Sequence, residues 1–342
     1  MSTNDITMVV HGPEVFDCGD VAWLMERLTP RVTLVAGVMA RTAAEESRLP
    51  VEFVGEPPSA ILRSIAGRAI LVNHGKTGES GKIFGEIVAS RLNNEQGLVH
   101  LECSSRTIFL WNDADASLGE EIAENTGFQR EYVVSRMGHE PGRREIRGCL
   151  PGEPVCVNGI VIGRATAGTV VLEGTGDAIR PISGLIPKAH GIEKLHRIGG
   201  VDLSHAWCKS GQIRSRAPAS GSRRTGTGRV VVIDHCGHEI FRELDADTGG
   251  VLAIGDDTTR VCGHICSHRG IPVLGIVDGD ADHLVDTAYA PGSVIVEVTK
   301  ERDDEVGVEV ARLVPPYPVQ WEEWVAQALA HLSTRGRVIY RY

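Results

Sequence analysis

Acidic side chains follow each of three apolar runs in the last third of the chain. Asp234 comes after the first run, Asp256 and Asp257 after the second, and Asp278 and Asp280 after the third. If these runs are neighbouring parallel strands, their carboxyl ends share one edge of a sheet, and the acids converge there. Crowded carboxylates repel one another unless a cation neutralises them, and Mg²⁺ prefers hard oxygen ligands. We therefore expect a magnesium site with Asp234, Asp278 and Asp280 as its ligands.

The same edge offers side chains for metal-assisted phosphate chemistry, which depends on positioning and on neutralising charge. The candidate catalytic residues are Asp234, Asp256 and Asp257, and the candidate contacts to a bound cofactor are Gly255 and Thr258. Two simpler interpretations stay open. Asp257 is suited to capping the helix that begins there, and the run 278–282 (DGDAD) is compatible with a turn that holds no metal.

A glycine-rich segment in the first third, residues 73–82 (NHGKTGESGK), joins an apolar run to a helical pattern. Backbone N–H groups at a helix amino terminus bind anions, and the helix dipole adds to the attraction. The segment is not a Walker A loop, because the first required glycine would fall at Ile70, inside the run. A glycine-rich turn with solvated lysines fits the segment equally well. The candidate cofactor contacts in this part of the chain are Gly12, Gly75, Lys76, Thr77 and Ser80.

Cysteine and histidine residues gather between 235 and 268, which raises the question of zinc. On one helix, Cys262 and Cys266 share a face, whereas His264 and His268 point elsewhere. The chain contains no C-x₂-C pair, the usual signature of a structural zinc site. We therefore expect no zinc. A site split between this helix and the segment 236–238 is the alternative that the spacing leaves open.

The charge of the chain excludes a generally basic nucleic-acid coat. Its 35 Lys and Arg residues against 45 Asp and Glu residues give 35 − 45 = −10. A hydrophobic content of 42% with 23% charged residues is typical of folded domains rather than of disorder. The sequence has no apolar run of the ~20 residues that a membrane span needs, and its first residues lack a signal-peptide pattern. Eight scattered cysteines fit a reducing compartment. We expect a cytoplasmic protein that binds neither membrane nor nucleic acid.

Apolar runs alternate with helical patterns at both ends of the chain, which indicates parallel βαβ units. We expect two doubly wound α/β domains: a Rossmann-like domain over 1–140 and a second over 229–342. Between them, residues 141–214 are rich in short β-branched runs and glycines, and Asn158-Gly159 is typical of a hairpin turn. We expect a small β-rich domain there, followed by a linker at 215–228.

The acidic strand ends of the last domain, with the D-x-D sequence at 278–280, resemble the Toprim arrangement of topoisomerases, primases and related nucleases. The resemblance covers about residues 229–285. Where Toprim domains carry a glutamate after the first strand, this chain has Asp234, with Glu239 five residues later. The resemblance implies a Toprim-like fold, bound Mg²⁺ and action on phosphodiesters.

Five further segments together resemble one archaeal family. They are VVHGPEVFDCGDVAWL, NHGKTGESGKIFGEIV, LPGEPVCVNGIVIGRA, GGVLAIGDDTT and GIPVLGIVDGDAD. In this order and over nearly the whole chain, they are similar to a domain of unknown function found mainly in methanogens, DUF2117. The resemblance implies a cytosolic archaeal protein. It assigns no reaction and no catalytic residue.

These observations favour a Mg²⁺-dependent enzyme, a phosphotransferase or phosphohydrolase, whose partner is a small phosphate-containing ligand such as a nucleotide or cofactor precursor. One alternative is a noncatalytic protein that binds a metabolite or assists cofactor assembly. A second is a Toprim-like protein acting on nucleic acid, which the net acidity and the lack of a basic stripe disfavour. The oligomeric state is not predicted.

Overall fold

The computed structural model describes residues 5–92, 96–135, 142–175, 178–197, 201–203, 206, 208–219, 221–222, 227–279, 288–299 and 301–342. The chain divides into two compact units. The first combines Met1–Cys156 with Ile162–Ser215, and the second combines Val157–Val161 with Arg216–Tyr342. The first unit thus includes most of the segment that we expected to form a β-rich domain.

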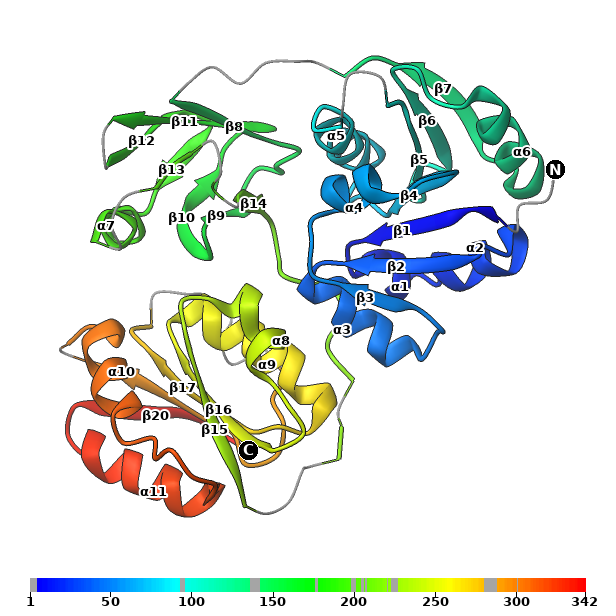
Figure 1. The fold of residues 1–342 in the computed structure, drawn as a ribbon. Coiled ribbons are helices and arrows are strands. Elements are labelled where there is room, and N and C mark those ends of the chain that lie inside the picture. Colours follow the sequence, from blue (N-terminus) through cyan, green and yellow to red (C-terminus); the bar gives the residue numbers. More distant parts are fainter. Residues whose placement is uncertain are drawn as a thin grey trace. The chain divides into compact units, whose positions relative to one another are not determined.

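The first unit is built on a seven-stranded sheet in the order β3-β2-β1-β4-β5-β6-β7 (Figure 1). Its strands are β1 (Thr7–His11), β2 (Val32–Ala36), β3 (Glu52–Val54), β4 (Ala69–Asn73), β5 (Leu98–Glu102), β6 (Thr107–Trp111) and β7 (Gln129–Val133). Strands β1 to β5 are parallel, whereas β6 is antiparallel to β5 and parallel to β7. Only residues 103–106 connect β5 to β6, and a connection this short joins antiparallel strands.

Helices cover both faces of this sheet. They are α1 (Glu14–Asp17), α2 (Asp20–Leu28), α3 (Val38–Ser47), α4 (Pro58–Ser64), α5 (Gly78–Ala89) and α6 (Ala116–Thr126). Successive side chains of a strand point to opposite faces. Met8 and Val10 of β1 accordingly pack in the core that contains residues of α2, α3 and α6. Val9 packs instead in the core that contains residues of α4 and α5.

Two small antiparallel sheets follow, with the orders β13-β10-β9-β14 and β12-β11-β8. Their residues belong to the first unit, except for Val157–Val161 in the β9–β10 hairpin, which belongs to the second. Their elements are β8 (Arg143–Arg147), β9 (Pro154–Val157), β10 (Ile160–Ala165), β11 (Thr169–Thr175), β12 (Ala178–Ser183), β13 (Leu185–Pro187), β14 (Cys208–Ser210) and the helix α7 (Ala189–Arg197). Asn158 and Gly159 both adopt positive φ, at 48° and 82°. They lie between β9 and β10, so the predicted hairpin turn is confirmed.

The second unit contains a six-stranded sheet in the order β19-β15-β16-β17-β18-β20. Its strands are β15 (Thr227–Asp234), β16 (Thr248–Ile254), β17 (Val273–Val277), β18 (Val294–Val298), β19 (Val319–Gln320) and β20 (Gly336–Arg341). The four central strands are parallel and the two edge strands are antiparallel to their neighbours. The expected parallel strands form the larger part of both large sheets, and antiparallel strands make each sheet mixed, so the fold is mixed α/β.

The helices of the second unit also lie on two faces of the sheet. They are the 3₁₀ helix η2 (Gly237–Glu239), α8 (Ile240–Glu243), α9 (Asp256–Arg269), α10 (Asp303–Ala311) and α11 (Trp321–Leu332). Trp321 and Trp324 of α11 are each 2% exposed and pack with α10 and one face of the sheet. They are packing anchors of this core. Helix α9 packs on β16 and β17. Within the described residues, no helix is long and apolar enough to cross a membrane.

Candidate functional site

The carboxyl ends of the parallel strands in the second unit bring acidic residues to one edge of the sheet. Gly255 follows β16 with φ +100°, a conformation that favours glycine, and turns the chain into α9. Asp256 is the first residue of that helix, and Asp278 directly follows β17. Asp303 is the first residue of α10, which comes after β18. Three different connections thus each supply one carboxylate.

These three carboxylates form a close cluster. One oxygen from each of Asp256, Asp278 and Asp303 lies within 4.8 Å of the other two. Asp256 is 8% exposed and Asp303 is 1% exposed, while Asp278 is partly exposed. Buried carboxylates at this spacing repel one another strongly when ionised, because water screens them little. The cluster is therefore suited to a cation.

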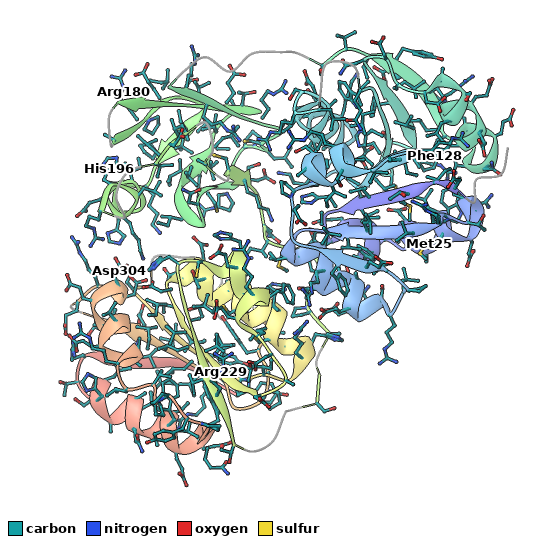
Figure 2. The ribbon with its side chains drawn as sticks, viewed as in Figure 1. Met25, Phe128, Arg180, His196, Arg229 and Asp304 are labelled. Atoms are coloured by element: carbon teal, nitrogen blue, oxygen red, sulfur yellow. The ribbon has the colours of Figure 1, made fainter. Side chains whose placement is uncertain are left out.

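A second group shares Asp303. The ligand atoms of His235, Asp303 and Asp304 also lie within 4.8 Å of one another. His235 Nε2 is 3.1 Å from Asp304 Oδ1, and its Nδ1 pairs with the Asp234 carboxylate. Figure 2 labels Asp304 at the amino-terminal end of α10. The imidazole thus lies between two carboxylates and next to the acidic cluster.

Glycine is required beside this imidazole. A Cβ placed on Gly255 would lie 2.9 Å from His235 Nε2, closer than side-chain contacts normally allow. His235 itself has a positive φ of 55°. The close approach of the β16–α9 turn to the ring therefore needs a residue without a side chain at 255.

Helix dipoles act on the same carboxylates. Asp256 and Asp303 each begin a helix, and the Asp304 N–H donates to Asp303 Oδ1 at 2.9 Å. The amino terminus of a helix carries partial positive charge and stabilises anions. This arrangement offers a second explanation for buried acids at the edge, one that needs no metal.

The expected site residues do not all come together. Asp256 and Asp278 meet in the cluster, whereas Asp234 pairs with His235. Asp257 accepts a hydrogen bond from the Val161 N–H at 3.2 Å within the second unit. Thr258 is buried in the first turn of α9, and Gly255 precedes that helix. Asp280 lies outside the described residues.

Sequence reasoning missed Asp303 and Asp304. They do not follow an apolar run directly, because residues 299–302 separate them from β18. The signal that was present is the acidic run 303–305 ahead of a helical pattern, which is typical of a helix amino terminus. It predicts the helix but not the meeting with acids from two other connections.

The glycine-rich loop after β4 surrounds a carboxylate of the chain itself. The Gly75 N–H donates to Glu102 Oε1 at 2.8 Å, and Glu102, at the end of β5, is fully buried. The backbone N–H groups and hydroxyls of Ser104 and Ser105 donate to the same carboxylate. Glu102 thus occupies the position at which an anion would meet the Gly75 N–H.

Other donors of this loop also have partners. Lys76 Nζ is 2.7 Å from Glu153 Oε2 and 3.2 Å from Ser210 Oγ. Thr77 and Ser80 form a capping box at the start of α5, each side chain bonding the other's N–H. Gly12 follows β1 with φ +91°. An incoming phosphate would compete with these bonds, and the anion site in this loop stays a prediction.

The cysteines of α9 lie in the core. Burial raises the pKa of the Cys262 thiol well above its ordinary value and that of Cys266 to about 12. Three groups of metal-binding side chains occur in the described part of the chain, and none of them includes Cys236, Cys262 or Cys266.

The chain is similar to a protein family and to an uncharacterized protein, both archaeal. The family described as "Uncharacterized protein conserved in archaea (DUF2117)" matches residues 8–315. The uncharacterized protein MJ0065 of Methanocaldococcus jannaschii is 33% identical, over 88% of this chain and 89% of that protein. No solved structure matches the chain.

Proposed function

The chain belongs to the DUF2117 family of archaeal proteins, and we propose that its second unit binds Mg²⁺ between Asp256, Asp278 and Asp303. The observation that carries the proposal is the burial of this cluster. Two of its three carboxylates are less than a tenth exposed, yet their oxygens lie within 4.8 Å of one another. Bringing like charges this close together and burying them is costly unless positive charge or a proton compensates.

The ligand chemistry favours Mg²⁺ over softer metals, because the cluster offers only carboxylate oxygens. In an octahedron with bonds of ~2.1 Å, ligand oxygens are roughly 3 to 4 Å apart, so small side-chain movements suffice here. Three carboxylates would leave coordination positions for water and for a ligand oxygen. This set shares Asp278 with the ligands expected from sequence, which also included Asp234 and Asp280.

We further propose that the ligand is a phosphate-containing molecule of the nucleotide or cofactor-precursor class, and that the protein transfers or hydrolyses its phosphoryl group. An acidic edge alone repels such an anion, and bound Mg²⁺ supplies the charge that attracts and polarises it. His235, held between Asp234 and Asp304, is the residue of this edge best suited to move a proton.

The strand orders support finer fold assignments as part of the same proposal. In the first unit, β3-β2-β1-β4-β5 is the strand order of a Rossmann-like sheet, in which ligands bind where the order reverses. In the second, β15, β16 and β17 are parallel neighbours followed by Asp234, Asp256 and Asp278, which supports a Toprim-like interpretation.

Isothermal titration with MgCl₂ tests the metal site. We expect one divalent ion per chain, and at least a tenfold loss of affinity in Asp278→Asn. Asp247→Asn is the matched control, because it removes the same charge from an exposed residue at the amino end of β16. Equal binding by wild type and Asp278→Asn would refute the assignment.

Thermal unfolding of Asp303→Asn separates the metal from the helix-dipole explanation. If the cluster is built for a cation, the variant is at least as stable as wild type without Mg²⁺, because one buried charge is gone. Wild type should then gain about 2.7 kcal/mol at a Mg²⁺ concentration of 100 times Kd, and the variant little. A variant that is less stable at every Mg²⁺ concentration would favour the dipole explanation.

Phosphate release from a panel of nucleoside di- and triphosphates, with Mg²⁺ or with chelator, tests the enzymatic part. Turnover that needs Mg²⁺ and fails in Asp278→Asn is the expected result. Tight nucleotide binding without turnover would instead favour the noncatalytic binding protein.

A further inference from the structure

A second cluster of metal-binding side chains lies in the first unit, at the carboxyl ends of β1 and β4. These two strands are parallel neighbours. The strand order reverses between them, because β2 and β3 lie beyond β1 on one side of the sheet and β5 lies beyond β4 on the other. Ligand sites of open α/β sheets occur at this position. The chain there provides Cys18, Asp20 and His74.

The local chain path brings these three residues together. Helix α1 follows β1 and ends before Cys18, and Gly19, with φ +81°, reverses the chain into α2, which begins at Asp20. His74 directly follows β4. Although Cys18 and His74 are 56 positions apart, the pairing of β1 with β4 places their connections side by side.

The three side chains are ordered as a thiol, an imidazole and a carboxylate. His74 Nδ1 is 2.7 Å from Asp20 Oδ2, and His74 Nε2 is 3.8 Å from Cys18 Sγ. Ligand atoms of all three lie within 4.8 Å of one another. A carboxylate on one ring nitrogen fixes the ring and leaves the other nitrogen free to bind, as in carboxylate–histidine–metal sites.

The distance between sulfur and nitrogen suits one shared metal ion. With Zn–S at ~2.3 Å, Zn–N at ~2.0 Å and a tetrahedral angle, the two ligand atoms are about 3.5 Å apart. The observed 3.8 Å differs from this by a few tenths of an ångström. Cys18 is exposed, and His74 and Asp20 are each 23% exposed, so solvent or a ligand can fill the remaining positions.

The surrounding charge favours a cation over a nucleophilic thiolate. Asp20, Asp17 and Glu14 all act electrostatically on the Cys18 sulfur. A catalytic thiolate is normally stabilised by positive neighbours, whereas the charged groups that act on Cys18 are acidic. A divalent ion is attracted by the same acids and takes the place of the thiol proton.

We propose that Cys18 Sγ and His74 Nε2 bind a divalent ion of the zinc type, with Asp20 as the positioning residue for the imidazole. This site is independent of the magnesium site in the second unit. It uses none of the cysteines and histidines at 235–268, for which the sequence analysis predicts no zinc. Thiolate and imidazole together select a borderline metal such as Zn²⁺ or Co²⁺ rather than Mg²⁺.

Titration of the full, metal-free chain with Co²⁺ tests the proposal, because thiolate-bound Co²⁺ absorbs in the near ultraviolet and carboxylate-bound Co²⁺ does not. We expect an absorption that saturates at one equivalent and that Zn²⁺ displaces. Cys18→Ser should abolish it, and Asp20→Asn should weaken Co²⁺ binding roughly tenfold or more. Cys236→Ser is the control and should leave the absorption unchanged, because Cys236 is a partly exposed cysteine close in sequence to histidines but outside this cluster.

Three results would overturn the assignment. One is the absence of the absorption in wild type, and another is its persistence in Cys18→Ser. The third is rapid alkylation of Cys18 that Zn²⁺ does not slow, which would identify a free nucleophile. Asp278→Asn should retain the cobalt signal, so failure here is distinguishable from failure of the magnesium site. Circular dichroism of each variant confirms that it is folded.

Discussion

A buried arginine holds three segments of the first unit together, and its removal should be costly. Arg214 Nε donates to Asp17 Oδ2 at 2.7 Å, and Nη1 and Nη2 donate to the Glu46 oxygens at 2.9 and 2.7 Å. Its side chain is 1% exposed, and those of Asp17 and Glu46 are 12% and 10% exposed. Arg214, which follows β14 in the chain, therefore joins the end of α1 to the last turn of α3.

The magnitude follows from what the substitution leaves behind. Arg214→Met keeps the length of the side chain but strands two carboxylates, each about nine-tenths buried, without their cation. Breaking a buried ion pair from one side typically costs 3–5 kcal/mol. At roughly 2–4 °C per kcal/mol for a unit of this size, the transition of the first unit should fall by roughly 6–20 °C.

Differential scanning calorimetry measures this, because a change confined to the first unit shifts one component of the heat-capacity curve. The control is Arg229→Met, which removes an exposed ion pair with Asp245 (Figure 2 labels Arg229) and should change little. Adding Asp17→Asn and Glu46→Gln to Arg214→Met should restore much of the loss. The reasoning is refuted if Arg214→Met is no more destabilising than Arg229→Met, or if the added changes make it worse.

Two further predictions concern the core of the first sheet. Burial lowers the pKa of His100 to about 3 and that of His11 to about 4, against 6.5 when unfolded. The unfolded state therefore binds more protons below pH 6.5, and stability should fall by about 4 kcal/mol from pH 7 to pH 5 while changing little above pH 7. Urea unfolding across this range measures the slope, which His100→Gln should roughly halve; a flat profile would contradict the prediction. Gly85→Ala would place a Cβ 2.1 Å from His100 Nδ1 and should lower the melting temperature despite the better helix propensity of alanine. Gly55→Ala, which meets nothing within 4 Å, is its control.

Local patterns in the sequence predict the fold class and the positions of helices and strands, but they do not predict which distant side chains pair. The β-branched runs at 230–233 and 251–254 predict strands because periodicity and propensity are local properties. The antiparallel pairings of β15 with β19 and of β18 with β20 are not local, and they make the second sheet mixed. The sequence placed Asp256 and Asp278 at this edge because each follows a strand. Asp303 was not, because only the folded chain brings α10 to the same edge.

The same limit applies to charged partners. The glycine-rich loop at 73–82 was compatible with an anion site from its composition alone. Nothing within the loop indicates that Glu102, on the next strand, accepts its Gly75 N–H. Arg214 directly precedes the segment 215–228, which its composition predicts to be a solvated linker. Its partners Asp17 and Glu46 are 197 and 168 positions away in the chain. Long-range ion pairs leave no periodic trace in a sequence.

The two buried thiols on α9 give the protein built-in reporters of its own motions. Cys262 and Cys266 are fully shielded in the native state, so an alkylating reagent can reach them only when α9 leaves the sheet. The rate of native-state labelling therefore measures the free energy of that opening. If this free energy of opening is smaller than that of global unfolding, the helix that begins at Asp256 detaches alone. If the two are equal, it detaches only when the whole unit unfolds. Bound metal at the acidic edge should then slow labelling of a helix face that the ion never touches.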